Sequence, residues 1–187
     1  MDLAGWEQRY RSQGEPSESP PHPLVVQAAN SLPAGRALDL ACGPGHNALW
    51  LAQHGWSVTA VDGSPQAIDI LRNRAGRSGV TIDTQIADLE KLAFPIKSGC
   101  YDLIAMCYYF QRDLIEQGKQ GLIPGGFMVV ITLLIEPGKE RSAFRLQPGE
   151  LRGYFANWEI LHYREGSDTW EHRVAEIVVR RPALGNM

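Results

Sequence analysis

Three aspartates stand in or after successive apolar segments, and their spacing suggests a binding site for a positively charged ligand. Asp39 lies four residues before Gly43, the first glycine of a turn, while Asp62 and Asp88 each follow a later segment. A carboxylate can hold an ammonium group and can accept hydrogen bonds from hydroxyl and amino groups. It repels phosphates, because like charges repel. The acids therefore favour a cationic ligand with hydroxyl and amino groups over a diphosphate.

A glycine turn lies beside the first of these acids. Gly43 and Gly45 have no Cβ, so the backbone can take positive φ there and a ligand can come close. The first position of the turn is Ala41, whose methyl group is expected to narrow it slightly. Gly43-x-Gly45-x-x-Ala48 also satisfies the pattern of dinucleotide-binding loops, so the glycines alone leave two classes of cofactor open.

The elements that hold these groups follow from apolar runs and turn residues. Residues 37–41 and 57–61 predict two buried strands, with a helix at 46–54 between them. Ser64 and Pro65 predict the N-cap and the first residue of the next helix. A third strand is expected at 80–87. Because ligands bind outside the carboxyl ends of strands in open α/β sheets, Asp62 and Asp88 are well placed for binding.

The second half of the chain predicts more strands and a closing hairpin. Strands are expected at residues 100–106, 127–134, 158–163 and 174–179, and helices at 112–122 and 150–155. Residues 122–126, Leu-Ile-Pro-Gly-Gly, should break the chain before the fifth strand, and a polar turn is expected at 165–168. The last strand should run antiparallel beside the fifth. This leaves no room for the separate catalytic domain that a dehydrogenase normally needs.

The first thirty-five residues are expected to form a helical segment outside the core. Residues 1–13 carry Trp6 and Tyr10 at helical spacing, the stretch 14–23 is rich in proline, and 24–32 has an apolar helical repeat. We interpret residues 1–35 as a lid over the cofactor pocket; a simple cover for the sheet edge is the alternative. The whole of 1–187 is expected to be one domain, with 36–187 as its cofactor-binding core.

Composition narrows the partners and the compartment. The chain has 187 residues, a net charge of −3, 44% hydrophobic and 21% charged residues, which is ordinary for a globular protein and gives no reason to expect nucleic acid. No apolar run approaches the ~20 residues of a membrane span, and the N-terminus does not look like a signal peptide. Cys42, Cys100 and Cys107 are not at metal-ligand spacing, so free thiols in the cytoplasm and no metal are expected.

The chain resembles the class I S-adenosylmethionine-dependent methyltransferases over nearly its whole length, and more closely the branch of tellurite-resistance and thiopurine methyltransferases. The resemblance is carried by Trp6-Glu7-Gln8-Arg9-Tyr10, Ala37–Gly43 with Asp62, Leu122–Gly126, Leu146–Leu151 and Trp158–Tyr163. It implies an α/β, Rossmann-like fold: a seven-stranded, mostly parallel sheet with an antiparallel last strand and helices on both faces. It also implies S-adenosyl-L-methionine as cofactor.

The resemblance assigns roles to the residues of the cofactor site. Asp39, Gly43 and Gly45 would hold the methionine moiety, Asp62 the ribose, and Asp88 with Leu89 the adenine. The remaining residues expected in this site are Trp6, Tyr10, Ala41, Gly63 and Cys107.

An acceptor pocket is expected where the fourth strand ends. Tyr108 and Tyr109 follow that strand, and aromatic faces suit a sulfonium cation and a polarisable acceptor. His172 and Arg173 precede the last strand, and a similar pair occurs in tellurite-resistance relatives. Arginine could hold an anionic acceptor and histidine could take a proton near neutral pH; an exposed hairpin pair without a role is the alternative.

These features favour methyl transfer to a small molecule, with a thiol, a selenol or a metalloid oxyanion as candidates. The Asn/Asp-Pro-Pro-Tyr motif of enzymes that methylate amino groups of nucleic acids is replaced here by Cys-Tyr-Tyr-Phe at 107–110, which counts against DNA bases. A monomer or homodimer is expected. Two alternatives stay open: a protein that binds the cofactor without turnover or methylates a protein partner, and, more remotely, an NAD(P)-dependent oxidoreductase.

Overall fold

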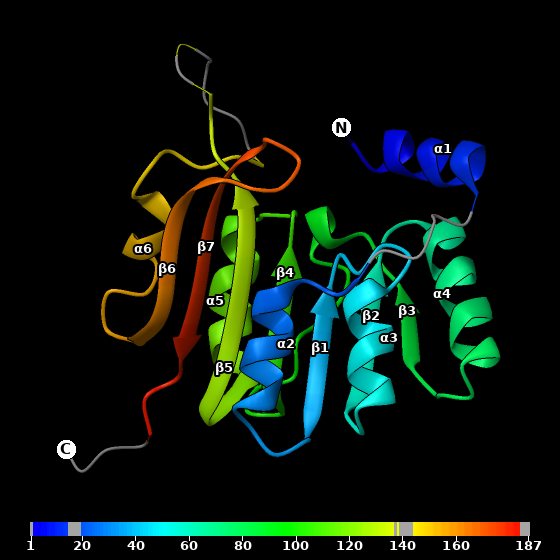
Figure 1. Ribbon diagram of the computed structural model, residues 1–187, viewed down its shortest axis with the longest axis horizontal. Helices are drawn as coiled ribbons and strands as arrows, with labels where there is room; N and C mark the ends of the chain where they lie inside the picture. Colours follow the sequence, from blue (N-terminus) through cyan, green and yellow to red (C-terminus); the bar gives the residue numbers. More distant parts are fainter. Residues whose placement is uncertain (1, 15–19, 137, 139–143, 184–187) are drawn as a thin grey trace. The chain divides into compact units, whose positions relative to one another are not determined.

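The computed structural model describes residues 2–14, 20–136, 138 and 144–183 (Figure 1). The chain divides into two compact units, Met1–Pro95 and Ile96–Met187, and each is described by itself. Within the described residues, no helix is both long and apolar enough to span a membrane.

The first unit is a parallel sheet with helices. Its elements are α1 (Leu3–Gln13), α2 (Pro23–Asn30), β1 (Arg36–Leu40), α3 (His46–Gln53), β2 (Ser57–Asp62), α4 (Pro65–Arg77), β3 (Asp83–Ile86) and the 3-10 helix η1 (Leu89–Lys91). The strands follow the order β3-β2-β1 and pair in parallel. The predicted third strand is shorter than expected, since it begins at Asp83 rather than at Val80.

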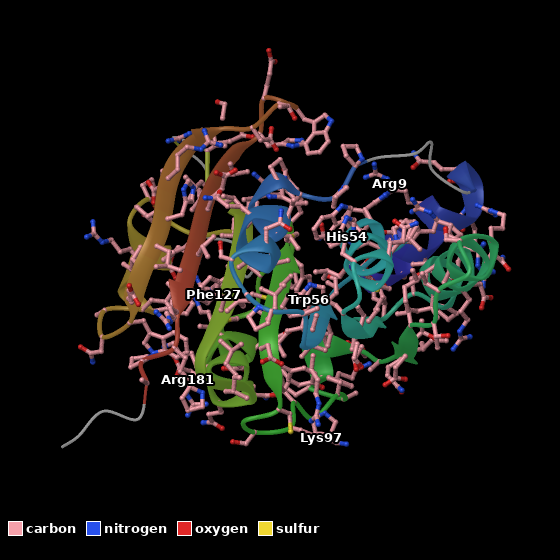
Figure 2. The ribbon with its side chains drawn as sticks, turned by 60° about the horizontal axis from the view of Figure 1, so that its bottom comes forward. Arg9, His54, Trp56, Lys97, Phe127 and Arg181 are labelled. Atoms are coloured by element: carbon pink, nitrogen blue, oxygen red, sulfur yellow. The ribbon has the colours of Figure 1, made fainter. Side chains whose placement is uncertain are left out.

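Local sequence signals explain why this unit folds as it does. Ser64 caps α4 by accepting a hydrogen bond from the Ala67 amide at 3.1 Å, and Pro65 is the first helical residue, as predicted. The apolar stripe that includes Ile68 and Leu71 is fully buried; burial of each such side chain stabilises the fold by about 1.5–3 kcal/mol. Trp56, labelled in Figure 2, is also buried, just before β2.

The second unit holds the remaining strands. Its elements are β4 (Tyr101–Cys107), α5 (Arg112–Gly121), β5 (Leu122–Leu133), α6 (Glu150–Gly153), β6 (Glu159–Ser167) and β7 (Arg173–Arg180). The strand order is β4-β5-β7-β6, with β4 and β5 parallel and with β7 antiparallel to both of its neighbours. The prediction of a last strand that runs antiparallel beside the fifth is therefore confirmed.

Two boundaries in this unit differ from the prediction. β5 begins at Leu122 and not after Gly126. Tyr101 on β4 pairs with Leu122 and Leu103 pairs with Phe127, so the extra residues of β5 form a bulge and the strand continues through them. Gly125, at φ +82°, allows this bulge, and a Cβ on Gly126 would lie 3.0 Å from the Asp102 carbonyl oxygen. Glycine here bends the strand and does not end it.

The turn between the last two strands also lies later than predicted. β6 continues through residues 165–167, which were expected to be a turn, and pairs with β7 as far as Ser167 opposite Arg173. The guanidinium of Arg164 spans both carboxylate oxygens of Glu176 on β7, at 2.9 and 3.0 Å. A bidentate pair of this kind supports the longer pairing.

The seven strands make the mixed sheet of the predicted class I fold. In the first unit, α1 lies on the side toward which the arrows of β1 and β2 point (Figure 1). This is the end of a parallel sheet at which α/β proteins bind their ligands.

Candidate functional site

The turn after β1 is built from left-handed backbone conformations. Ala41, Gly43 and Gly45 have φ values of +53°, +52° and +80°. A Cβ on Gly45 would lie 2.2 Å from Cδ1 of Leu71 on α4, and one on Gly43 would lie 2.9 Å from the Tyr10 hydroxyl oxygen. The positive φ favours glycine at both positions, and a Cβ would in addition require Leu71 to move at Gly45 and Tyr10 to move at Gly43.

Asp39 is buried beneath this turn with half of its carboxylate unpartnered. Its Oδ2 accepts a hydrogen bond from the Ala48 amide at 3.1 Å, while Oδ1 is buried without a partner. Burial, and to a lesser degree the charge of Asp62, raises the pKa of the Asp39 carboxyl to about 7. A buried acceptor without a donor is unfavourable and suits an incoming cationic donor.

Asp62, at the end of β2, stabilises the turn through hydrogen bonds to backbone amides. Its Oδ2 accepts from the Gly43 amide and its Oδ1 from the Ser64 amide, both at 2.8 Å. Burial raises the pKa of Asp62, and these two amide groups offset part of that rise. Each carboxylate oxygen keeps a second lone pair that could accept from a hydroxyl group.

Asp88 lies at the start of η1 and is more exposed. It accepts from the Glu90 amide at 3.1 Å, and the ammonium of Lys91 lies 2.8 Å from its Oδ2. This contact with Lys91 lowers the pKa of Asp88, so the group is ionised at neutral pH. Leu89 follows it and is buried.

An open groove of about 700 Å³ runs between α1 and the residues that follow β2 and β3. It is lined by Asp2, Leu3, Ala4, Glu7, Gly63, Pro65, Asp88, Glu90 and Lys91. The lining includes two residues of the predicted cofactor site, Gly63 and Asp88. It carries four carboxylates against one ammonium group, so the groove is acidic.

Helix α1 is attached to the N-terminus of α4 by Glu7, a contact that the sequence did not reveal. Glu7 Oε2 accepts from the Ser64 hydroxyl and, at 3.2 Å, from the Gln66 amide. Its Oε1 accepts from Arg11 Nε at 2.7 Å. The helix dipole favours a carboxylate at this position. Only the N-cap role of Ser64 was readable from the sequence, since its partner is fifty-seven residues away.

The two aromatic residues predicted for the cofactor site lie on this helix. Trp6 and Tyr10 stack with ring centroids 5.8 Å apart, and the guanidinium of Arg9 (Figure 2) lies 5.1 Å from the Trp6 ring centroid. Tyr10 reaches the glycine turn at Gly43. Burial, helped by the charge of Asp62, raises the pKa of Tyr10, so its hydroxyl stays a hydrogen-bond donor.

In the second unit, the structure separates the two tyrosines predicted for the acceptor pocket. Tyr108 has φ +58° and its ring meets that of Trp170 edge to face, with centroids 5.7 Å apart. Tyr109 instead donates from its hydroxyl to Gln111 Oε1 at 2.8 Å. Cys107, which ends β4, is half-buried and is not part of a disulfide.

The predicted pair at the start of β7 is also divided. The His172 ring lies against Asp168, with Nδ1 3.3 Å from Oδ2, and Tyr108 also hydrogen-bonds Asp168. Arg173 is exposed. Asp168 and Trp170 were missed from the sequence, although an aspartate that binds the amide two residues on is a common turn signal.

The described residues contain no group of three or more His, Cys, Asp or Glu side chains that could hold a metal ion.

Fold and site together define the class of this protein. A glycine turn between a buried acid and a second acid at the end of the next strand, with an antiparallel seventh strand, is the arrangement of the class I S-adenosylmethionine-dependent methyltransferases. Within that class, the chain belongs to the family described as tellurite resistance protein TehB, whose profile matches residues 9–176.

Two curated relatives match the chain over 154 residues. The chain is 29% identical over 154 residues to hemagglutinin 1 of Eikenella corrodens, which covers 77% of this chain and 50% of that protein. It is 28% identical over 154 residues to the probable S-adenosyl-L-methionine-dependent methyltransferase TehB of Haemophilus influenzae, covering 77% of this chain and 53% of that protein. The chain thus spans about half the length of these curated relatives.

Solved structures show the same fold. The crystal structure of TehB from Haemophilus influenzae matches with a TM-score of 0.76 and 23% identity, covering 94% of this chain and 67% of that one. A second match is geranyl diphosphate C-methyltransferase from Streptomyces coelicolor A3(2), solved in complex with Mg²⁺, geranyl-S-thiolodiphosphate and S-adenosyl-L-homocysteine. Its TM-score is 0.67 and its identity 15%, and the match covers 84% of this chain and 75% of that one.

Proposed function

We propose that the protein binds S-adenosyl-L-methionine and transfers its methyl group to a small-molecule acceptor. The observation that carries this proposal is the buried, unpartnered Oδ1 of Asp39 beneath the glycine turn. An ammonium group is the donor that this atom lacks, and the cofactor's methionine moiety carries one. Membership of the TehB family supports the same reading.

The neighbouring residues suit the rest of the cofactor. Asp62 would accept from the ribose hydroxyls, Asp88 from the adenine amino group, and Tyr10 could donate to the cofactor's carboxylate. Four carboxylates in the groove would repel the diphosphate of a dinucleotide, which disfavours an NAD(P)-dependent oxidoreductase. The acidic groove therefore supports the sulfonium cofactor.

When bound, S-adenosyl-L-methionine supplies a methyl group on a positively charged sulfur that an acceptor lone pair can displace. The protein would contribute mainly by holding the two reactants in line, which can lower the barrier by ~7–11 kcal/mol. We propose a thiol, a selenol or a metalloid oxyanion as acceptor, since such soft atoms need little further activation. Tyr108, which follows β4, and His172, in the turn before β7, both contact Asp168 and are the residues proposed to contact the acceptor.

We also propose that the protein acts in the cytoplasm as a monomer or homodimer. Cys42, Cys100 and Cys107 form no disulfide within the described residues, which agrees with a reducing compartment.

Calorimetry with S-adenosyl-L-methionine, S-adenosyl-L-homocysteine and NADH tests cofactor binding. We expect micromolar affinity for the first two, about −8 kcal/mol, and none for NADH. Asp62→Ala should weaken both by about 1–3 kcal/mol, because ribose hydroxyls lose their acceptor. Since Asp62 also holds two amides, folding of the variant must be checked by circular dichroism. Unchanged affinity in folded Asp62→Ala would remove this residue from the site.

Turnover is then measured as release of S-adenosyl-L-homocysteine with a panel of thiols, selenols, tellurite and selenite. Tight cofactor binding without release for any acceptor in the panel would favour the binding-only alternative. Methyl incorporation into added protein instead would favour a protein substrate.

A further inference from the structure

Asp168 organises the turn between β6 and β7. Its side chain is only 5% exposed, and its Oδ1 accepts from the Trp170 and His172 amides, both at 2.8 Å. Glu171, between these two residues, has φ +63°, a conformation that non-glycine residues rarely adopt. One oxygen of a buried carboxylate therefore holds an unusual turn in place.

The same carboxylate also contacts two side chains. The His172 ring lies with Nδ1 3.3 Å from Oδ2, and the Tyr108 hydroxyl is hydrogen-bonded to Asp168. Burial alone would raise the pKa of Asp168, but the hydrogen bonds from His172, Trp170 and Tyr108 outweigh it and lower this pKa. The group is thus ionised at neutral pH and can only accept. Nδ1 of His172 and the hydroxyl of Tyr108 must both donate to it.

This arrangement determines which nitrogen of His172 is basic. A neutral imidazole carries one proton, so a ring with its proton on Nδ1 presents a lone pair on Nε2. The side chain is 56% exposed, so the ring is accessible to a small molecule. Trp170, 63% exposed and packed edge to face on Tyr108, offers an aromatic surface beside it.

Two other charged groups near the turn, Arg164 and Glu176, are paired with each other, while the neighbours of His172 in the chain, Glu171 and Arg173, are exposed. Arg164 on β6 is paired with Glu176 on β7, and the Nε2 of His162 lies 3.7 Å from Glu176. The Cys107 thiol lies next to Tyr108 in the chain. Among the described residues around the turn, Asp168 is the carboxylate that meets the His172 ring.

We infer that Asp168 is a positioning residue that holds His172 with its proton on Nδ1, so that Nε2 takes a proton from the methyl acceptor. The inference rests on the proposed methyl transfer and narrows its substrate class to acceptors with an S–H, Se–H or O–H group. The X–H proton passes to Nε2, the X lone pair forms the bond to the methyl carbon, and the sulfur–methyl bond breaks to leave S-adenosyl-L-homocysteine. The imidazolium then returns its proton to solvent.

Asp168→Asn tests this with little change in shape. The Trp170 and His172 amides can only donate, so the asparagine oxygen should stay on them and keep the turn. Its NH₂ group then faces the His172 ring and can only donate, which forces the proton from Nδ1 to Nε2. ¹⁵N NMR of the imidazole should show Nδ1 protonated in the unaltered protein and Nε2 protonated in the variant. Asp113→Asn, the same change at an exposed position of α5, is the control and should leave the ring unchanged.

Turnover gives the second readout, because general-base catalysis is worth about 10²–10⁴-fold. With an alkyl thiol, Asp168→Asn should lower kcat about 100-fold without changing cofactor affinity. With nitro-aromatic thiols, which are already ionised at neutral pH, the two proteins should differ by less than about threefold. If Asp168 had a purely structural role, the substitution would lower kcat by the same factor with both kinds of thiol.

Two results would overturn the inference: a His172 ring protonated on Nε2 in the unaltered protein, or equal loss of turnover across the thiol series. Failure of the proposed function itself looks different, since it would appear as no turnover with any acceptor in the unaltered protein. That result would also remove the proton-transfer role of His172, whereas the NMR measurement would still decide whether Asp168 sets its tautomer.

Discussion

At the scale of single residues, Ala41 in the turn after β1 has a strained backbone conformation that glycine would adopt without strain. Ala41 has φ +53°, where an L-residue with a Cβ costs about 1–2 kcal/mol and glycine does not. Ala41→Gly should therefore stabilise the folded protein by about 1 kcal/mol after the greater entropy of an unfolded glycine is deducted. For a protein of this size, the midpoint of thermal unfolding should rise by about 2–4 °C.

A matched substitution separates this effect from a general response to glycine. Ala75→Gly, inside α4, should destabilise by about 1 kcal/mol or more, since glycine is a poor helix former. Equal losses in both variants would show that the Ala41 methyl is not strained.

The protonation state of Asp39 should make cofactor affinity depend on pH. Burial raises the pKa of the Asp39 carboxyl to about 7, and only the ionised carboxylate attracts an ammonium group. Cofactor binding below pH 7 must then release a proton, so affinity should fall up to tenfold per pH unit from 7 toward 5 and level off above 7. Calorimetry in two buffers of different ionisation enthalpy measures this release.

Asp39→Asn is the control for this behaviour. The variant should bind the cofactor more weakly at pH 8 and should have lost the steep pH dependence. A flat affinity profile in the unaltered protein would exclude Asp39 as the group that holds the ammonium.

At the scale of elements, Glu7 attaches α1 to the N-terminus of α4 beside the cofactor groove. A carboxylate at a helix N-terminus contributes about 0.3–1 kcal/mol, and up to ~2 kcal/mol when partly buried. If residues 1–35 act as a lid, Glu7→Gln should accelerate dissociation of S-adenosyl-L-homocysteine about two- to tenfold. Stopped-flow tryptophan fluorescence, to which Trp6 on α1 contributes, can follow this step, and a Trp6→Phe variant identifies that contribution.

Glu90→Gln provides the comparison, because it removes the same charge from the same groove without touching α4. Faster dissociation only in Glu7→Gln supports a lid; equal acceleration in both would mean that the groove charge alone retains the ligand.

At the scale of the whole molecule, the two buried acids make stability depend on pH. The pKa of Asp39 and that of Asp62 are both raised by burial, so the folded protein holds protons that the unfolded chain has released. The free energy of unfolding should therefore fall as pH rises from about 4 to 7. A rise of about three pKa units at Asp39 corresponds to about 4 kcal/mol.

Urea unfolding of the ligand-free protein at pH 5, 6, 7 and 8 measures this slope. Asp88, Glu150 and Asp168 have lowered pKa values, so their contribution is complete by about pH 5 and does not obscure the window. Asp39→Asn should remove most of the pH dependence of the free energy of unfolding. Stability that increases through this range in the unaltered protein would contradict a protonated Asp39 in the fold.

Local signals in the sequence were sufficient for the strand–turn–helix framework and for the position of several residues of the candidate site. The acids Asp39 and Asp62 and the glycines between them lie within one short stretch, where apolar runs and turn residues act over a few positions. The antiparallel last strand was also predictable, since the late pair of strands has a family precedent. The bulge at Gly125 and the later hairpin turn were not, because pairing with a neighbouring strand decided them.

Only the tertiary structure decided which side chains meet. Glu7 and Ser64 are fifty-seven residues apart, and Tyr108 and Asp168 come from different strands and turns of the second unit. Tyr108 and Tyr109 look equivalent in the sequence, yet the left-handed conformation of Tyr108 sends one ring to Trp170 while the other bonds Gln111. Residue types and spacing determined the chemistry that could be present. Which partner each polar group finds, and hence its charge and tautomer, depends on packing between segments that local patterns do not encode.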